Sequence, residues 1–176
     1  MVMEKIILVG FMGCGKTTLG KKLAKRLKVP FIDSDVEIEI LHKKTIGEIF
    51  GEHGESGFRE METEFINSLE REKSYVLATG GGMPCFNNSM EQLNNLGTTF
   101  YLERSAKELM HRLSHAKIKR PMIASLSDDD LLQFIEEKLS MRSEFYKKAA
   151  VILSREEQTA DELEKLIRLL QPLQKN

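Results

Sequence analysis

A glycine-rich segment, Gly10-Phe-Met-Gly-Cys-Gly-Lys-Thr17, limits the possible folds of this chain more than any other feature. It fits the pattern Gly, four residues, Gly-Lys-Ser/Thr, in which backbone N–H groups turn inward around phosphate groups. The segment follows the apolar run Ile6–Val9 and precedes Thr17–Lys28, where apolar residues recur at helical spacing. A buried strand, a phosphate loop and a helix in that order predict a nucleoside triphosphate site, because a chance glycine turn would lack this context.

The loop supplies residue types that suit a nucleotide and its metal ion. Lys16 can reach the outer phosphates, and the Thr17 hydroxyl can ligate Mg²⁺. A GTP-binding switch would carry an Asn-Lys-x-Asp motif, which this sequence lacks, and 176 residues are too few for a large ATPase motor. The pattern therefore favours a kinase that acts on a small molecule.

Short apolar segments alternate with helical ones along the whole chain, with no linker and no internal repeat. The expected strands are residues 6–9, 31–32, 75–78, 98–102 and 151–153, and the expected helices are 17–28, a stretch from Thr45 to Leu69, one from Ser105, 131–149 and one from Thr159. Residues 114–130 are polar and lack a clear period, so we expect mostly loop there. This alternation predicts an α/β fold, a three-layer sandwich whose parallel sheet of five strands is covered on both faces, in one domain of residues 1–176.

Composition argues against several classes of protein. Lys and Arg number 26 and Asp and Glu 27, a formal charge of −1, which does not suit a protein that binds duplex nucleic acid. No apolar run approaches the ~20 residues that a membrane helix needs. Cys14 and Cys85 are too few for a disulfide scaffold or a structural zinc site, and none of the four histidines has metal-ligand spacing. We expect a cytoplasmic protein with no nucleic-acid or membrane partner.

Two polar clusters follow expected strands, at the sheet edge where α/β proteins bind ligands. Asp33 and Asp35 follow the second strand; their mutual repulsion suggests a cation or a hydroxyl-rich ligand, although Asp35 could equally cap a helix. Gly80–Gly82 follows the third strand, and three consecutive glycines indicate close approach of the backbone to a ligand.

Three arginines have both a functional and an ordinary interpretation. Arg59 could be a surface helix residue paired with a nearby glutamate. Arg142 occupies an apolar position of the helix 131–149, so it must either meet an anion or extend to the edge of the core. Arg120 belongs to a basic run in the polar loop, which is either a solvated surface or a mobile lid over phosphate.

In combination, these segments resemble shikimate kinases over essentially the whole chain. The resemblance rests on six motifs in the family's order: Gly10–Thr17, Asp33-Ser-Asp35, Phe58-Arg59-x-x-Glu62, Thr79-Gly-Gly-Gly82, Arg120-Pro121 and Met141-Arg142-x-x-x-Tyr146. It implies the fold of the nucleoside monophosphate kinases, with a substrate-binding segment at about 33–62 and a lid at about 112–127.

The resemblance also implies a role for each matching residue. The implied ATP-binding residues are Gly13, Cys14, Gly15, Lys16, Thr17, Thr18, Arg112 and Arg120, with Arg112 stacking on adenine. Thr17 and, through water, Asp33 would hold Mg²⁺. The implied shikimate-binding residues are Asp35, Arg59, Gly80, Gly81, Gly82 and Arg142, with both arginines on the carboxylate. Lys16, Asp35 as proton acceptor and Arg120 would be catalytic.

The resemblance thus implies an ATP:shikimate 3-phosphotransferase of aromatic amino acid biosynthesis, acting as a monomer. Two alternatives remain at this point. A gluconate or nucleotide kinase of the same fold would differ in the acceptor, and a nucleotide acceptor would favour more arginines and no Asp-x-Asp pair. A nucleotide-binding module without catalysis would be expected to lack one of the residues Lys16, Asp35, Arg59 or Arg142, and all four are present.

Overall fold

A single five-stranded sheet forms the centre of the molecule. The computed structural model describes residues 5–69, 73–115, 123 and 126–170. Its strands are β1 (Lys5–Val9), β2 (Phe31–Asp33), β3 (Tyr75–Ala78), β4 (Thr98–Leu102) and β5 (Val151–Leu153), in the order β2-β3-β1-β4-β5. Every neighbouring pair is parallel. The sequence-based expectation of a parallel sheet with five strands is confirmed.

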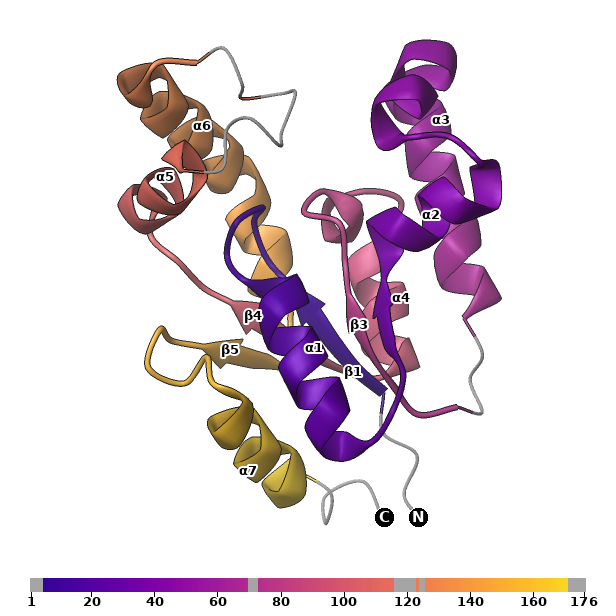
Figure 1. Cartoon of the computed structure of the whole chain (residues 1–176), viewed down its shortest axis with the longest axis vertical. Coiled ribbons are helices and arrows are strands. Elements are labelled where there is room, and N and C mark those ends of the chain that lie inside the picture. Colours follow the sequence, from indigo (N-terminus) through magenta and orange to yellow (C-terminus); the bar gives the residue numbers. More distant parts are fainter. Residues whose placement is uncertain (1–4, 70–72, 116–122, 124–125, 171–176) are drawn as a thin grey trace.

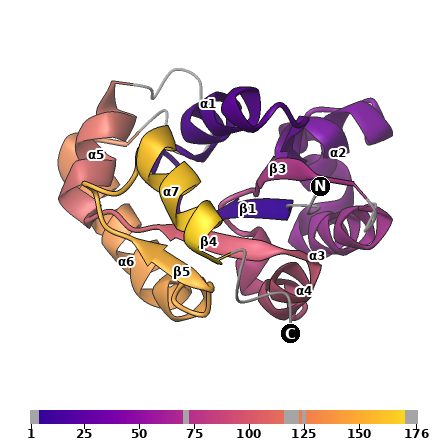
Figure 2. The same ribbon diagram turned by 90° about the horizontal axis from the view of Figure 1, so that it is seen from below.

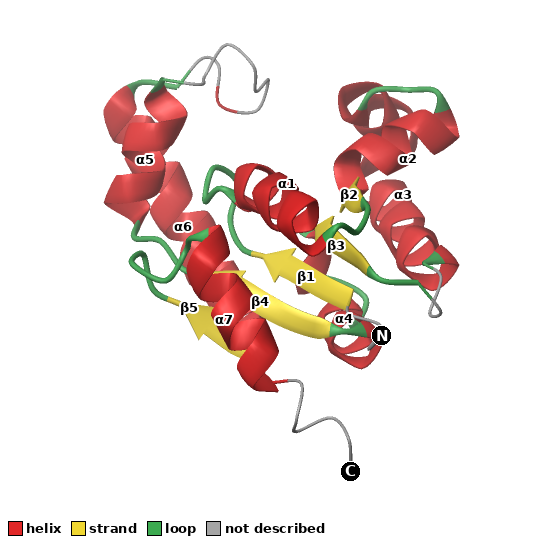
Figure 3. Ribbon diagram, turned by 60° about the horizontal axis from the view of Figure 1, so that its bottom comes forward, coloured by secondary structure: helices red, strands yellow, loops and turns green. Residues whose placement is uncertain are grey.

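Helices cover both faces of this sheet. They are α1 (Lys16–Leu27), α2 (Ser34–His42), α3 (Ile46–Ser68), α4 (Ser89–Leu96), α5 (Ala106–Ser114), α6 (Asp128–Tyr146) and α7 (Ala160–Leu170), with a short 3₁₀ turn η1 (Met83–Cys85). Helices α1 and α7 lie on one face, and α4 and α6 lie on the other (Figures 2 and 3). Ile7, Leu8 and Val9 in the central strand are fully buried, as strands covered on both faces must be.

The carboxyl ends of the strands point toward two groups of helices. In Figure 1, α2 and α3 stand on one side of this edge and α5 and α6 on the other, with the loop after β1 between them. The two helix pairs pack within themselves, α2 against α3 and α5 against α6. This arrangement brings segments far apart in the sequence around the amino end of α1.

Local sequence signals explain where the helices begin. Both expected capping boxes form, Thr45 with Glu48 at the start of α3 and Ser105 with Glu108 at the start of α5. Helix α6 starts at Asp128 and ends at Tyr146, so the expected boundaries 131–149 were three residues too late at each end. Ser127 caps this helix by accepting a hydrogen bond from the Asp130 amide.

Helix α3 is interrupted at Gly54. That residue has φ 66° and ψ −174°, a conformation that is essentially restricted to glycine, and it separates two helical segments.

Among the described residues, no helix is both long and apolar enough to cross a lipid bilayer.

Candidate active site

The loop between β1 and α1 has the geometry of a phosphate cradle. Gly13 and Gly15 have φ of 80° and 113°, conformations that a side chain would strain, and α1 begins directly afterwards at Lys16. Lys16 is 8% exposed, and its Nζ donates to the carbonyl oxygens of Gly10 at 2.7 Å and Phe11 at 3.0 Å. The ammonium therefore lies across the loop at a positively polarised helix end, where anions are stabilised.

A cavity of about 410 Å³ opens from this loop. It brings together most of the sequence-predicted residues: Gly13, Gly15, Lys16, Thr17, Thr18, Asp33, Asp35, Gly81 and Arg112. These residues come from the loop, from α1, from the carboxyl ends of β2 and β3, from α2 and from α5. The nucleotide loop and the Asp-x-Asp cluster thus share one cavity.

Thr17 and Asp33 form the part of this cavity that suits a magnesium ion. The Thr17 hydroxyl donates to Oδ2 of Asp33 at 2.9 Å, so two hard oxygen donors lie side by side. Mg²⁺ prefers oxygen ligands and is commonly held by one or two protein oxygens together with phosphates and water. Within the described ranges there is no group of three acidic, histidine or cysteine side chains that could hold a metal alone. The donor set fits a metal that arrives with a nucleotide.

Asp35 lies inside α2 and does not cap it. The N-cap position is Asp33, and Asp35 belongs to the first helical turn. Ser34, which is fully buried, accepts a 2.7 Å hydrogen bond from the Gly80 amide, and this bond joins the end of β2 to the end of β3. A Cβ at Gly80 would lie only 2.4 Å from Oδ1 of Asp35. The absence of a side chain at Gly80 is what lets the Asp35 carboxylate approach the backbone.

Arg59 is buried, which excludes the surface interpretation. It is 8% exposed, and its guanidinium donates from Nη1 to Glu62 and from Nη2 to Glu55, both at 2.8 Å. The Phe86 ring centroid lies 4.1 Å from the guanidinium carbon. A Cβ at Gly82 would lie 2.7 Å from both terminal nitrogens of Arg59. The glycine triplet is therefore packed against the two charged groups, Asp35 at one end and Arg59 at the other.

Glu62 is a member of the site to which sequence reasoning gave no role. Its side chain is 2% exposed, and one carboxylate oxygen, Oε1, is buried without a partner among the described residues. Burial raises the pKa of Glu62 to about 7, although the neighbouring charge of Arg59 lowers it. Asp35 raises this pKa and Arg142 lowers it, so both of those groups lie within electrostatic reach. The available sequence signal was its place three residues after Arg59 on one helix face.

Helix α6 contributes Arg142 and Tyr146, which contact the phosphate loop and the glycine triplet. The Arg142 guanidinium carbon lies 5.8 Å from the centroid of the Phe11 ring, next to the phosphate loop. Tyr146 is fully buried, and its hydroxyl donates to the Gly81 carbonyl oxygen at 2.5 Å. Burial also raises the pKa of the neighbouring Cys85 thiol to about 11, so this cysteine stays protonated at neutral pH.

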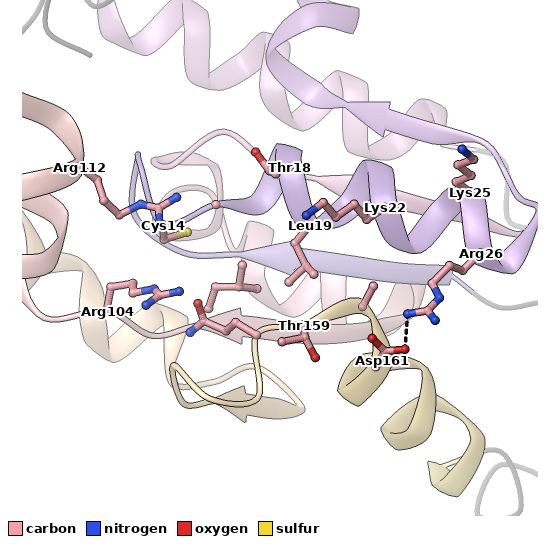
Figure 4. Close-up of a pocket in the computed structure, with 14 residues that line it drawn as sticks. Cys14, Thr18, Leu19, Lys22, Lys25, Arg26, Arg104, Arg112, Thr159 and Asp161 are labelled. Atoms are coloured by element: carbon pink, nitrogen blue, oxygen red, sulfur yellow. Dashed lines mark ion pairs between the residues drawn. The ribbon is translucent and has the colours of Figure 1, made fainter. Parts of the chain in front are cut away.

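A second cavity of about 520 Å³ lies on the other side of the loop, between α1 and α7. Figure 4 shows Arg112 beside Cys14 at one end of this cavity and Arg26 paired with Asp161 at the other. Nη1 of Arg26 lies 2.5 Å from Oδ1 of Asp161 in this ion pair. Nε of Arg112 donates to the Gly13 carbonyl oxygen at 2.7 Å, and Arg112 lines both cavities. This location beside the loop suits a group attached to the bound phosphates.

Some sequence expectations fall outside the part of the chain that the structure describes. Arg120 and Pro121 belong to the segment 116–122, and much of the expected lid at 112–127 lies there too.

Of the histidines, His53, His111 and His115 are exposed and His42 is partly buried.

Comparisons with known proteins identify the family of this chain. A sequence model of the family described as shikimate kinase matches residues 12–171. A shikimate kinase of Bacteroides fragilis is 47% identical over 150 residues, which are 85% of this chain and 84% of that protein. The crystal structure of the Bacteroides thetaiotaomicron shikimate kinase superposes with a TM-score of 0.86 at 41% identity, covering 97% of this chain and 99% of that one.

A further solved structure contains a ligand. Shikimate kinase from Acinetobacter baumannii, determined in complex with shikimate, has a TM-score of 0.84 at 34% identity and covers 99% of this chain and 97% of that one. The family match spans nearly the whole chain, the phosphate loop and the Asp-x-Asp cluster share one cavity, and the buried Arg59 lies against Gly82. This chain is a kinase and belongs to the shikimate kinase family.

Proposed function

We propose that this chain transfers the γ-phosphoryl group of ATP to the 3-hydroxyl of shikimate, giving shikimate 3-phosphate. The observation that carries this proposal is the shared cavity, in which the Lys16 loop faces the Asp35 carboxylate. The reaction would be a step of chorismate and aromatic amino acid biosynthesis, carried out in the cytoplasm by a monomer. The relative from Acinetobacter baumannii that was solved with shikimate supports the choice of acceptor.

The phosphates of ATP would lie in the loop and accept from the backbone N–H groups of Gly13, Cys14 and Gly15, the Cys14 N–H leaving its 3.2 Å bond to the Phe11 carbonyl oxygen. Lys16 would exchange its carbonyl partners for phosphate oxygens and spread the charge of the transferring group. Thr17 and, through water, Asp33 would hold Mg²⁺, which would supply positive charge to offset that of the phosphates. Arg112 lines the cavity on each side of the loop and would stack on the adenine, with Thr18 nearby.

The acceptor would lie beside the glycine triplet, between Asp35 at one end and Arg59 at the other. Asp35 would hold its hydroxyls and accept the proton that the attacking hydroxyl loses. Arg59 and Arg142 would take the carboxylate, because a planar guanidinium can donate two parallel hydrogen bonds to it. Gly80 and Gly82 would help to bind the acceptor by letting Asp35 and Arg59 lie against the backbone, and Gly81 lines the cavity that the ring would enter. Fixing the acceptor at both ends aligns its hydroxyl with the γ-phosphate, which is most of what phosphoryl transfer requires.

Two segments would close over the bound substrates. Residues 33–62 form the substrate-binding segment and residues 112–127 the lid, with Arg120 reaching the transferring phosphate from the lid. Closure would exclude water, which competes with the hydroxyl as acceptor.

A coupled assay of ADP release tests the proposal directly. Reactions contain shikimate, gluconate, AMP or no acceptor, each with and without added Mg²⁺. We expect rapid, magnesium-dependent release with shikimate alone. Preference for gluconate or AMP would favour another kinase of this fold, and equal release with and without acceptor would contradict phosphoryl transfer to a small molecule.

The arginine assignment has its own test. Arg59→Lys and Arg142→Lys keep the charge but lose the two-pronged geometry. We expect each to lower kcat/KM for shikimate roughly ten- to a hundredfold, the scale of a lost charge-assisted hydrogen bond. The dissociation constant of ATP, measured without acceptor, should change little. Unchanged acceptor kinetics in both variants would remove the carboxylate site.

A further inference from the structure

The two carboxylates that hold Arg59 differ sharply in burial. Glu62, on Nη1, has a side chain that is 2% exposed, whereas Glu55, on Nη2, is 58% exposed. Releasing Glu62 from the guanidinium would leave a buried carboxylate without its cation, which is costly. Releasing Glu55 would transfer an already hydrated carboxylate to water. Glu55 is therefore the partner that an incoming anion can displace.

The hydrogen-bonding edge that Glu55 occupies is only half used. Nε and Nη2 lie on the same side of a guanidinium and together match the two oxygens of one carboxylate. Nη2 donates to Glu55, while Nε is buried and has no hydrogen-bond partner in the described part of the chain. A carboxylate that took the whole edge would satisfy both nitrogens and gain a hydrogen bond that Glu55 does not supply.

Glu55 directly follows the break in α3. Glu55 is the first residue after Gly54, whose φ of 66° and ψ of −174° end the preceding helical segment. A Cβ at Gly54 would meet nothing within 4 Å, so there is open space on that side of the turn. Glu55 is thus the first residue of a helical segment, and its side chain, which is 58% exposed, has room to turn away from Arg59.

We propose that Glu55 is a positioning residue that stands in for the acceptor carboxylate. It holds the Nε–Nη2 edge of Arg59 until the substrate arrives and is then displaced by the substrate carboxylate. This proposal rests on the function proposed above, because it takes Arg59 as a carboxylate-binding residue. Its consequence is selectivity: an alcohol without a carboxylate cannot replace Glu55 and gains nothing at this edge, whereas a carboxylate exchanges one hydrogen bond for two.

Removing the negative charge of Glu55 should improve substrate binding. Glu55→Gln keeps the size of the side chain but weakens its hold on Arg59. We expect KM for shikimate, and its dissociation constant measured calorimetrically without nucleotide, to fall about 1.5- to fivefold, the range for a partly exposed ion pair. The kcat should stay within about twofold of the parent, because Glu55 is absent from the transition state. An unchanged or raised KM would overturn the proposal.

Glu60→Gln is the matched control. Glu60 is an exposed glutamate on the same helix, and its substitution removes the same charge from the same segment. A fall in KM in this variant equal to that in Glu55→Gln would show a general effect of net charge and would contradict displacement at Arg59. A fall confined to Glu55→Gln supports it.

A double variant separates this inference from the assignment of Arg59. If Arg59→Lys leaves acceptor KM unchanged, the carboxylate site itself is wrong and the present inference fails with it. If Arg59→Lys raises KM but Glu55→Gln does not lower it, only the role of Glu55 fails. Displacement at Arg59 further requires the effect of Glu55→Gln to shrink markedly in the Arg59→Lys background, because the two side chains act through one contact. Equal effects in both backgrounds would count against it.

Discussion

The Tyr146 hydroxyl donates a 2.5 Å hydrogen bond to the Gly81 carbonyl oxygen, although the two residues are 65 positions apart in the sequence. This bond attaches the end of α6 to the glycine triplet. Arg142 lies one helical turn before Tyr146, so the same contact sets the position of the arginine relative to the site.

Substituting Tyr146 tests this coupling. Tyr146→Phe keeps the buried ring but removes the donor to Gly81, and we expect a loss of about 0.5–1.5 kcal/mol in the free energy of unfolding, since the part-buried Gly81 carbonyl oxygen loses its donor. Because the triplet and Arg142 would lose their common anchor, KM for the acceptor should rise as well. Denaturant unfolding and acceptor kinetics measure the two effects. A loss of stability with unchanged KM would show that the bond supports the fold alone.

Lys16→Ala should abolish phosphoryl transfer. The ammonium is buried across the phosphate loop, where its charge would offset the negative charge of the β- and γ-phosphate oxygens. Binding of the acceptor, measured calorimetrically, should be largely retained, because Lys16 is assigned to the nucleotide. Turnover within a few fold of the parent would show that this loop does not stabilise the transferring group.

Asp35→Asn should lower kcat by about a hundredfold or more, the usual contribution of a positioned base. Asparagine keeps the shape but cannot take the proton, and a capping role cannot explain a loss because Asp35 lies inside the first turn of α2. Single-turnover rates, together with a melting curve to establish folding, give the measurement. Near-normal turnover in a folded variant would assign the proton to another acceptor.

Gly80→Ala should damage the site through Asp35. The added Cβ would come within 2.4 Å of its carboxylate, so the carboxylate must move, and we expect kcat to fall at least tenfold, as for other displaced catalytic groups. Gly51→Ala is the control, since a Cβ at that helical position meets nothing within 4 Å. That change should be neutral or slightly stabilising because alanine favours helix. Similar losses in both variants would point to a general effect on folding.

The stability of the protein should depend on the protonation of Glu62. Its pKa is raised from 4.5 in the unfolded chain to about 7 in the folded protein, so the folded form binds more protons in between. Linkage then requires the free energy of unfolding to fall as the pH rises through this window. Glu62→Gln cannot titrate, so its stability relative to the parent should increase from pH 5 to pH 8. A pH-independent difference between the two proteins would contradict the raised pKa.

Much of the fold follows from local sequence signals. The five strands are apolar runs, two helices start with capping boxes, and the phosphate loop has a fixed spacing. The start of α6 was also available from the sequence, because Ser127 followed by Asp128–Asp130 has the cap and the acidic first turn that favour a helix amino end. Its end was misjudged because Ala149 continues the apolar spacing past Tyr146, where the helix stops.

The candidate site was only partly accessible to such reasoning. The residue types of the loop and of the Asp-x-Asp cluster indicate their chemistry wherever the chain places them. The burial of Arg59, by contrast, depends on Phe86 and Gly82, which reach it from another part of the chain. The roles suggested for Glu62 and Tyr146 likewise arise from contacts between elements, and a periodic pattern on one helix cannot reveal them.

The order of strands in the sheet has a consequence for the synthesis of this protein. Strand β1 pairs with β3 and β4, so its hydrogen-bonding partners begin about 70 and 90 residues later in the chain. Until the ribosome has released the segment through Ala78, the apolar run Ile6–Val9 has neither of its partner strands, and β4 on its other side is complete only at Leu102; until then the run is open to chaperones or to association with other chains. The phosphate loop that directly follows β1 is thus translated well before β3 and β4, the two strands that hold β1 in the centre of the folded sheet.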